Sequence, residues 1–277
     1  MSGLIDLHMH SSASDGILSP PRLAEECFNL GVEYAALTDH DTADGQDGFL
    51  SAAKDRGINA VTGIELNVEH RCELHILGYG YDLLYPPLKE ALSHLRQERA
   101  ARAGRIVSTL QKNGYLISLK RVLEIAGGGV VGRPHIARAL VEKGYCKNIS
   151  QAFKEFLCEG GPGYAKRERL SPADAIRLIN DAGGKAVLDH PGCMENEDYP
   201  ALLARLKAYG LYGIESFYPE HTDEQCEYFL RLSMDFGLLP TCGTDYHGNR
   251  YNEKFPGGEK RGIDFVLSTA KNLMRNS

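Results

Sequence analysis

Short hydrophobic runs alternate with amphipathic stretches over most of the chain. Seven runs predict buried strands, at residues 4–7, 32–37, 58–64, 74–79, 185–188, 211–214 and 238–242. Amphipathic spacing between them predicts helices at residues 20–30, 44–56, 172–182, 201–209 and 223–236. Strands that alternate with helices are typical of a parallel sheet that is covered by helices.

Capping residues support these boundaries. Ser19-Pro20, Ser171-Pro172 and Thr222-x-x-Gln225 each place a capping side chain directly before a predicted helix. Glycines at positions 31, 183 and 237 follow the ends of the same helices.

Residues 86–165 depart from this alternation. Leucine and isoleucine at positions 88, 92, 95, 106 and 110 predict a long helix, and shorter helices are predicted at residues 119–126, 134–143 and 150–157. We therefore assign residues 1–90 and 166–277 to one discontinuous α/β domain. We expect residues 91–165 to form a helical insertion domain that contributes to substrate binding. The tail after about Lys271 is expected to be frayed.

Polar side chains of the kinds that bind metal ions lie at or beside the ends of the predicted strands. There are nine of them: His8, His10, Asp15, His40, Glu65, His75, His190, Asp245 and His247. In an α/β barrel such side chains meet at the end of the sheet where the parallel strands finish. An open doubly wound sheet would carry a Gly-rich phosphate loop after the first strand, and the chain has no G-x-G-x-x-G or Walker sequence. The sequence therefore favours a barrel.

The composition is that of an ordinary globular protein, with 277 residues, 43% of them hydrophobic, and a formal net charge of −6. This acidic balance gives no reason to expect a membrane or duplex DNA as a partner. No apolar run approaches the roughly 18 residues of a membrane span. The seven cysteines are odd in number and form no C-x-x-C pair, so we expect reduced thiols in a cytoplasmic protein.

The nine nitrogen and oxygen donors are too many for one ion and suit two or three. No cysteine accompanies them at zinc-finger spacing, so a structural zinc site is not expected. Imidazole together with carboxylate suits manganese, zinc or iron.

The order of these motifs resembles the PHP (polymerase and histidinol phosphatase) superfamily of metal-dependent phosphoesterases. The motifs are Asp6-x-His8-x-His10, Ser14-Asp15-Gly16, Thr38-Asp39-His40, Gly63-x-Glu65, Leu74-His75, Asp189-His190-Pro191 and Gly243-x-Asp245-x-His247. The resemblance covers the chain outside the helical insertion. It implies a distorted seven-stranded, TIM-like (β/α)7 barrel.

The resemblance also implies a trinuclear metal centre. Its ligands would be His8, His10, Glu65 and Asp245 for a first ion, Glu65, His75 and His190 for a second, and Asp15, His40 and His247 for a third. Some relatives carry histidine in place of Asp15, and a carboxylate there lowers the preference for softer ions. The implied nucleophile is a metal-bridging hydroxide, with no side-chain nucleophile.

The segment Gly132-Arg133-Pro134-His135 resembles the insertion of one PHP subgroup, the 3′,5′-nucleoside bisphosphate phosphatases and related 5′–3′ exonucleases on short RNA. Arg133 and His135 would then bind substrate phosphate, with Lys166 as a weaker candidate. Residues 96–143 hold ten Lys or Arg against three Glu, a local net charge of +7 that suits a polyanion. Without the resemblance, the residues favour an ion pair of Arg133 with a carboxylate and simple packing of His135.

Five further polar residues follow the same strands. Asp39 and Asp189 precede ligand histidines and are expected to orient imidazoles through hydrogen bonds. Glu215, Tyr218 and His221 either support the ligands or donate the leaving-group proton, and a capping role at the rim is an equal alternative.

We expect a phosphoesterase that removes the 3′-phosphate of nucleoside 3′,5′-bisphosphates and that also trims short 5′-phosphorylated RNA. Histidinol-phosphate phosphatase is an alternative within the superfamily. A noncatalytic, metal-stabilised interaction module is an alternative of another class.

Overall fold

Seven strands form one sheet in the computed structural model, which describes residues 3–194, 196–248 and 256–275. The strands follow one another across the sheet in chain order. They are β1 (Leu4–Asp6), β2 (Val32–Leu37), β3 (Asn59–Val68), β4 (Leu74–Tyr79), β5 (Lys185–Leu188), β6 (Gly213–Phe217) and β7 (Leu239–Cys242). Their number agrees with the count expected from the hydrophobic runs.

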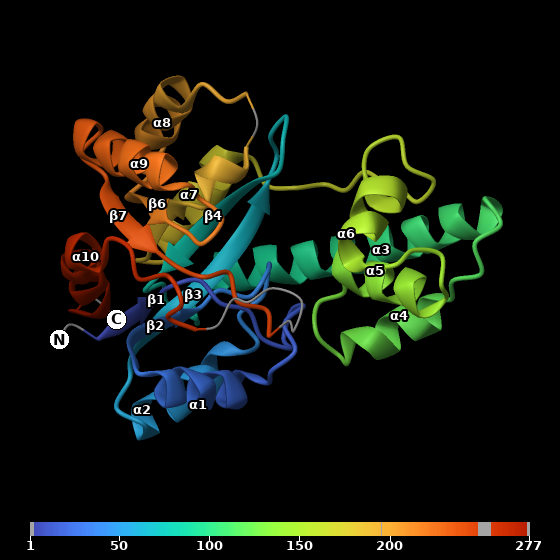
Figure 1. Ribbon diagram of the computed structural model, residues 1–277, viewed down its shortest axis with the longest axis horizontal. Helices are drawn as coiled ribbons and strands as arrows, with labels where there is room; N and C mark the ends of the chain where they lie inside the picture. Colours follow the sequence, from blue (N-terminus) through green and yellow to red (C-terminus); the bar gives the residue numbers. More distant parts are fainter. Residues whose placement is uncertain (1–2, 195, 249–255, 276–277) are drawn as a thin grey trace.

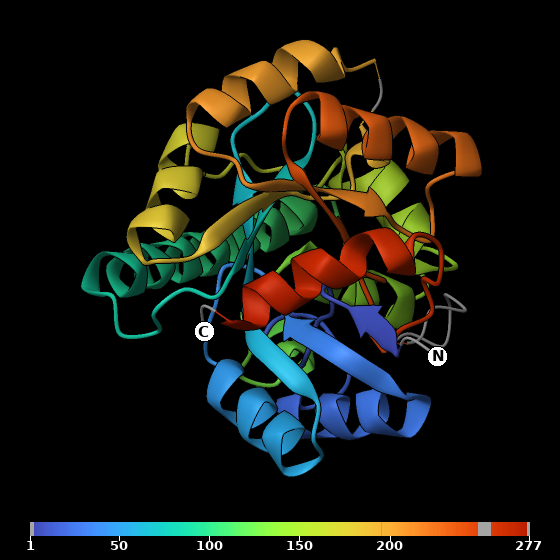
Figure 2. The ribbon, with the colours of Figure 1, turned by 90° about the vertical axis from the view of Figure 1, so that its left-hand side faces the viewer.

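Helices surround these strands (Figures 1 and 2). They are α1 (Pro20–Leu30), α2 (Gln46–Asp55), α7 (Pro172–Asp181), α8 (Tyr199–Ala208), α9 (Asp223–Asp235) and α10 (Ile263–Arg275). The expected caps form at two of them, since the hydroxyls of Ser171 and Thr222 accept hydrogen bonds from the backbone N–H groups of Asp174 and Gln225. Ser19 precedes α1, but its side chain makes no capping hydrogen bond.

The expectation of an all-parallel sheet is wrong at β4, which runs antiparallel to both β3 and β5. Only residues 69–73 connect β3 to β4, and a parallel pairing would need a crossover of a dozen residues or more. The hairpin places the start of β4 beside the end of β3, with His75 opposite Asn67. His75 therefore reaches the same end of the sheet as side chains that follow the parallel strands.

The C-terminal helix α10 corrects a second expectation, because the chain is helical through Arg275 instead of fraying after Lys271. Val266, Ala270 and Leu273 have the spacing of one helix face and are buried in the same apolar cluster as Ile5 and Val61. This burial holds α10 against β1, β3 and β7.

Residues 86–157 form helices and their connecting loops, with no strand. The helices are α3 (Pro86–Lys112), α4 (Leu119–Ala126), α5 (Arg133–Glu142), α6 (Ile149–Ala152) and the π-helical turn η1 (Phe153–Leu157). Helix α3 crosses from the sheet to α4–α6, which lie at the end of the molecule opposite α10 (Figure 1). Its first half buries Leu88, Leu92 and Leu95 in the core beside the sheet, whereas Ile106 and Leu110 belong to a separate helical core. The helix runs without a break through residue 91, where we placed the start of the insertion.

None of the described helices is both long enough and apolar enough to cross a bilayer.

A buried tyrosine joins strands from different parts of the sheet. The Tyr79 hydroxyl on β4 donates a 2.8 Å hydrogen bond to the backbone oxygen of Leu7, directly after β1. The backbone N–H of Leu7 donates in turn to the oxygen of Cys242 on β7, at 3.2 Å. The chain that leads to His8 is thereby fixed from two sides.

We expect Tyr79→Phe to lower the free energy of unfolding by about 1–2 kcal/mol, because the Leu7 carbonyl loses a buried partner while the packing volume is kept. Chemical denaturation measures this difference. Tyr34→Phe is the matched control, since Tyr34 is only partly buried. Equal effects of the two substitutions would contradict the role given to the Tyr79 hydroxyl.

Candidate metal centre

The structure brings all nine expected ligands together at one end of the sheet. Their donor atoms form three groups, each with atoms within 4.8 Å of one another: His8, His10, Glu65 and Asp245; Glu65, His75, Asp189 and His190; and His10, Asp15, His40 and His247. The groupings contain the three ligand sets implied by the resemblance. They add Asp189 to the second set and His10 to the third.

Two extended segments position the first group. His8 and His10 are separated by one residue after β1, so both side chains emerge on the same side. The segment after β7 lies parallel to them, because Asp245 N–H donates to His8 O at 2.7 Å and His10 N–H donates to Tyr246 O at 2.8 Å. Asp245 is thereby placed beside both imidazoles.

Glu65 lies at the centre of the cluster and is 1% exposed. Its Oε2 lies 3.1 Å from His10 Nε2 and 3.0 Å from His40 Nδ1. Its Oε1 contacts His75 Nδ1. The two carboxylate oxygens therefore face different groups of imidazoles, which is the arrangement of a bridging ligand.

The donor atoms fit divalent cations better than they fit one another. His8 Nε2 and His10 Nε2 face each other at 3.2 Å, and His10 Nε2 is also 3.1 Å from Asp245 Oδ1. Several buried polar atoms around them have no hydrogen-bond partner in the described chain: His10 Nδ1, His40 Nδ1, Glu65 Oε2, His75 Nδ1 and both carboxylate oxygens of Asp189. Buried nitrogen and oxygen atoms that converge in this way can be satisfied by manganese, zinc or iron.

Opposite charges inside the cluster shift its pKa values in opposite directions. Burial opposes ionisation of Glu65, but His40 and His75 outweigh it and hold the pKa of Glu65 well below its usual range. Burial also opposes protonation of His10, yet Asp245 and Glu65 raise the pKa of His10 to about 10. Bound cations would replace these protons as the charge that balances the carboxylates.

Two acidic residues hold the far side of His8. Its Nδ1 lies 3.1 Å from Asp189 Oδ1 and 3.3 Å from Glu215 Oε1, which leaves Nε2 directed at the cluster. This is the orienting contact expected of a carboxylate beside a metal-binding histidine. Burial raises the pKa of Glu215 to about 8.

Asp39 organises a loop instead of an imidazole. Its carboxylate accepts hydrogen bonds from Ser11 N–H at 2.8 Å, from the Ser11 hydroxyl at 2.6 Å and from the Ser14 hydroxyl at 2.6 Å. These bonds fix the turn that carries Asp15, which explains why serines occupy this stretch.

The other two expected residues lie at the border of the cluster. The Tyr218 hydroxyl donates to Asp245 Oδ2 at 3.3 Å. His221 is buried, and its Nε2 accepts from Gly192 N–H at 3.0 Å, so it supports the turn that follows His190. Burial lowers the pKa of His221 to about 4.

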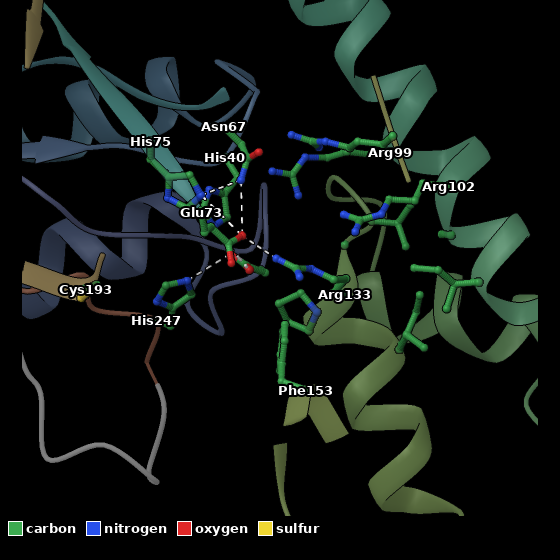
Figure 3. Close-up of a pocket in the computed structure, with 18 of the residues that line it drawn as sticks. His40, Asn67, Glu73, His75, Arg99, Arg102, Arg133, Phe153, Cys193 and His247 are labelled. Atoms are coloured by element: carbon green, nitrogen blue, oxygen red, sulfur yellow. Dashed lines mark hydrogen bonds and ion pairs between the residues drawn. The ribbon is translucent and has the colours of Figure 1, made fainter. Parts of the chain in front are cut away.

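A cavity of about 350 Å³ opens onto this cluster. His40, His75, His190 and His247 line one side of it, and Arg99, Arg102, Arg133 and Arg167 line another. Figure 3 shows Arg99, Arg102 and Arg133 reaching across from the helical side toward the histidines. Ile106, Val131, Ile136 and Phe153 give the cavity an apolar part as well.

Arg133 lines this cavity while forming an ion pair with Glu73, and its guanidinium lies 5.3 Å from the centre of the Phe153 ring. His135 is 2% exposed, and its Nδ1 accepts from Gly132 N–H at 3.0 Å at the start of α5. Burial lowers the pKa of His135 to about 4. An ion pair of Arg133 with a carboxylate and a buried His135 are what we expected from the sequence when the family resemblance is left aside.

The structure directs Arg167, not Lys166, toward the cluster. Lys166 is exposed and lines a neighbouring cavity with Arg105 and Glu168. Burial alternates along residues 166–169, as in an extended chain, so adjacent residues point to opposite sides. The residue expected at the site, Lys166, is therefore one position away from the residue that lines the cavity, Arg167.

Sequence reasoning also missed the anchor of this arginine. Asp41 is fully buried, and its Oδ2 accepts from Arg99 Nε at 2.6 Å and from Arg167 Nη2 at 3.1 Å. Burial opposes ionisation of Asp41, but the two guanidinium groups lower its pKa to about 2. The sequence held only an indirect signal for the arginine side of the cavity. Arg99 and Arg102 are three residues apart, so they share one face of α3.

The model of the PHP domain family matches residues 6–164 of the chain. The chain belongs to the PHP domain family. A 5′–3′ exoribonuclease of Haemophilus influenzae is 35% identical over 89% of this chain and 91% of the relative. A 3′,5′-nucleoside bisphosphate phosphatase of Chromobacterium violaceum is 33% identical over 88% of this chain and 87% of the relative.

Two solved structures have a fold similar to that of this chain over nearly its whole length. A Chromobacterium violaceum structure, described as an amidohydrolase with bound sulfate and no metal, has a TM-score of 0.87, 29% identity, and covers 97% of this chain and 96% of its own. A putative metal-dependent phosphoesterase from Bifidobacterium adolescentis has a TM-score of 0.84, 27% identity, and covers 95% of each chain.

We expect Glu65→Gln to remove more bound metal than Asp15→Asn, because Glu65 belongs to two donor groups and Asp15 to one. Elemental analysis of the purified variants measures the metal-to-protein ratio. Glu73→Gln is the matched control, since Glu73 lines the same cavity outside the three groups and should leave the ratio unchanged. A larger loss in Asp15→Asn would contradict the central position given to Glu65.

Proposed function

We propose that this PHP protein is a metal-dependent phosphoesterase that removes the 3′-phosphate from nucleoside 3′,5′-bisphosphates. The observation that carries the proposal is the cavity, which has the His/Asp/Glu cluster on one side and four arginines on another. A phosphoester needs both kinds of surface, because its oxygens must be held while water attacks the phosphorus.

The proposed ligands are those of the three donor groups, and they would hold two or three ions of manganese, zinc or iron. Such ions lower the pKa of coordinated water and neutralise charge on phosphate oxygens. No serine or cysteine is required as a nucleophile.

The residues of the chain itself position the substrate. Arg133 forms an ion pair with Glu73, and an incoming phosphate would compete with that carboxylate for a guanidinium that donates two parallel hydrogen bonds. His135 supports Arg133 indirectly, because its Nδ1 accepts from Gly132 N–H and so fixes the first turn of α5. Asn67 lies 2.6 Å from His75 Nε2 and holds that imidazole in place.

The apolar part of the cavity favours a nucleoside over a small amine. Ile106, Val131, Ile136 and Phe153 provide a surface on which a base and ribose can be buried. Histidinol phosphate has one phosphate and a cationic amine, and the arginine side of the cavity repels such an amine.

The relatives support the same chemistry and one extension of it. Their names include a nucleoside bisphosphate phosphatase, exoribonucleases and, in Eggerthella lenta, a phosphoribosyl 1,2-cyclic phosphate 1,2-diphosphodiesterase that is 32% identical over 88% of this chain. Phosphodiesters as well as monoesters occur among these substrates. We therefore propose that the protein also trims short 5′-phosphorylated RNA from its 5′ end.

We further propose that the sheet closes into a distorted barrel and that residues 91–165 form an inserted substrate-binding domain. The hydrogen bond between Leu7 and Cys242 supports the first point. The separate core of α4, α5 and the end of α3 supports the second, and Arg133 enters the cavity from that part of the chain.

A substrate panel tests the proposed function. We expect the metal-loaded protein to release phosphate from adenosine 3′,5′-bisphosphate with a kcat/KM at least about tenfold higher than from histidinol phosphate, because the second phosphate and the base add contacts. A 5′-phosphorylated oligoribonucleotide forms the third arm. Preference for histidinol phosphate would overturn the proposal, and the absence of hydrolysis with manganese, zinc and iron would favour a noncatalytic module.

We expect Arg133→Ala to lower kcat/KM for adenosine 3′,5′-bisphosphate by about 10- to 100-fold, as is typical when one charged hydrogen-bond donor to a phosphate is lost. Metal content should stay unchanged, because Arg133 belongs to none of the donor groups. Arg121→Ala is the control, since Arg121 pairs with Glu142 on the exposed face of the helical region. An undiminished kcat/KM in Arg133→Ala would contradict the phosphate-binding role.

A further inference from the structure

A further group of metal-binding side chains lies outside the cluster of nine candidate ligands, which we call the main cluster. It consists of His70 and Cys72 on the loop between β3 and β4, and of Glu197 on a facing segment. Donor atoms of these three residues, the hairpin group, lie within 4.8 Å of one another. The proposed function uses none of them.

The hairpin group contains three kinds of atom that bind zinc, namely an imidazole nitrogen, a thiol sulfur and a carboxylate oxygen. His70 Nε2 lies 3.0 Å from Glu197 Oε2, and ligand atoms around a tetrahedral zinc ion are roughly 3–4 Å apart. Among the groups formed by described residues, only this one includes a cysteine. Thiolate favours zinc over manganese, so the hairpin group and the main cluster differ in the ions that they prefer.

The hairpin keeps its two donors close to each other. They are separated by one residue on a loop of only five residues, 69–73. The pair of Val68 with Leu74 closes this loop, and the Glu69 N–H donates to Leu170 O at 2.8 Å. The loop therefore has little freedom to move the imidazole away from the thiol.

Glu197 reaches the hairpin from a segment that lies 127 residues beyond His70 in the chain. The Glu197 side chain is 9% exposed and the His70 side chain is 10% exposed, so both are held in place. Burial opposes ionisation of Glu197, but His70 and Arg71 outweigh it and lower the pKa of Glu197. The sequence does not reveal this group, because a His-x-Cys pair lacks zinc-finger spacing and the third donor is far away.

Arg71 offers a simpler interpretation of the same residues. Its Nη2 lies 2.8 Å from Glu197 Oε2, so an ion-pair network of His70, Arg71 and Glu197 would by itself join the hairpin to the facing segment. That network gives no role to the Cys72 thiol. The carboxylate can also bind the guanidinium through one oxygen and a cation through the other. His70 lines a cavity of about 180 Å³, through which an ion can reach the group.

An ion at this position would join two parts of the chain that carry ligands of the main cluster. The hairpin leads directly into His75 on β4. On the other side, the Tyr199 hydroxyl donates to Pro191 O at 2.7 Å and to Met194 O at 2.9 Å, which holds the segment near Glu197 close to the turn after His190. The ion would therefore fix these two parts relative to each other.

We propose that His70, Cys72 and Glu197 bind one zinc ion, with water as the fourth ligand, and that this ion stabilises the hairpin against the segment of Glu197. The site is separate from the proposed phosphoesterase centre and does not depend on its reaction. Burial raises the pKa of the Cys72 thiol, and bound zinc would replace the proton that the thiol otherwise keeps and release it to solvent.

Cobalt(II) is the probe, because it occupies zinc sites and a thiolate bound to it gives a strong charge-transfer absorption in the near ultraviolet. We expect the wild-type protein to show this absorption and Cys72→Ser to lose it. Cys193→Ser is the matched control and should keep it, since Cys193 lines the cavity beside the main cluster. His70→Ala should weaken the cobalt binding that this absorption reports by at least about tenfold, because one of three protein ligands is lost.

Thermal unfolding tests the stabilising role. Zinc should raise the melting temperature of the wild-type protein more than that of Cys72→Ser, because the main cluster is intact in both and only one has the second site. Equal shifts would contradict the stabilising role. Circular dichroism of the metal-free variants checks that they are folded, and Glu197→Gln, which removes the third donor, replaces Cys72→Ser if that variant does not fold.

Three spectroscopic results would overturn the zinc site: no charge-transfer absorption in the wild-type protein, absorption kept in Cys72→Ser, or absorption lost in Cys193→Ser. Unchanged cobalt affinity in His70→Ala would do the same, because the thiol would then bind the ion without the imidazole. All four results leave the proposed function standing, since no residue of the hairpin group belongs to the main cluster.

Discussion

The mutual burial of carboxylates and imidazoles at one end of the sheet is the constraint on which the rest of the structure depends. An isolated charge in this position would be strongly disfavoured, so each group must face a partner of opposite charge or a cation. Glu65 shows the result, because each of its oxygens contacts a different imidazole. Asp189 and Glu215 extend the same principle outward by holding the far nitrogen of His8. The buried carboxylates and imidazoles thus compensate one another only if the strands that carry them are aligned correctly in the sheet.

The sheet topology supplies that register. If all strands were parallel, only residues that follow their C-terminal ends would lie at the end of the sheet that holds the cluster. His75, however, lies near the start of its strand. The antiparallel direction of β4 places that start at the correct end of the sheet, and the short hairpin fixes it beside Asn67. Hydrogen bonds between the segments after β1 and β7 do the same for His8, His10 and Asp245. One reversed strand is therefore part of how the centre is assembled.

The convergence of the nine candidate ligand residues could be predicted, because few residue types bind metal ions and these residues lie at or beside the ends of regular strands. Features set by local phase or by partners far along the chain could not. Lys166 and Arg167 differ by one position in an extended segment, and only the burial of that segment shows which of them faces the site. Asp189 was expected to orient an imidazole, yet its donor atoms also belong to the second group. The apolar face of α10 could be recognised from Val266, Ala270 and Leu273, but the surface that it packs against includes β1 and β3, which lie far earlier in the chain.

Asp41 connects the two charged systems that face each other across the cavity. It directly follows His40, and its backbone N–H donates to Glu65 O at 3.0 Å, so it lies beside the cluster of histidines and carboxylates. Its carboxylate holds Arg99 and Arg167, so it also anchors the arginine side. The residue adopts a φ of 52°, which an aspartate tolerates better than most side chains and which the surrounding bonds maintain. A rigid anchor of this kind fixes the separation between the cluster and the arginines.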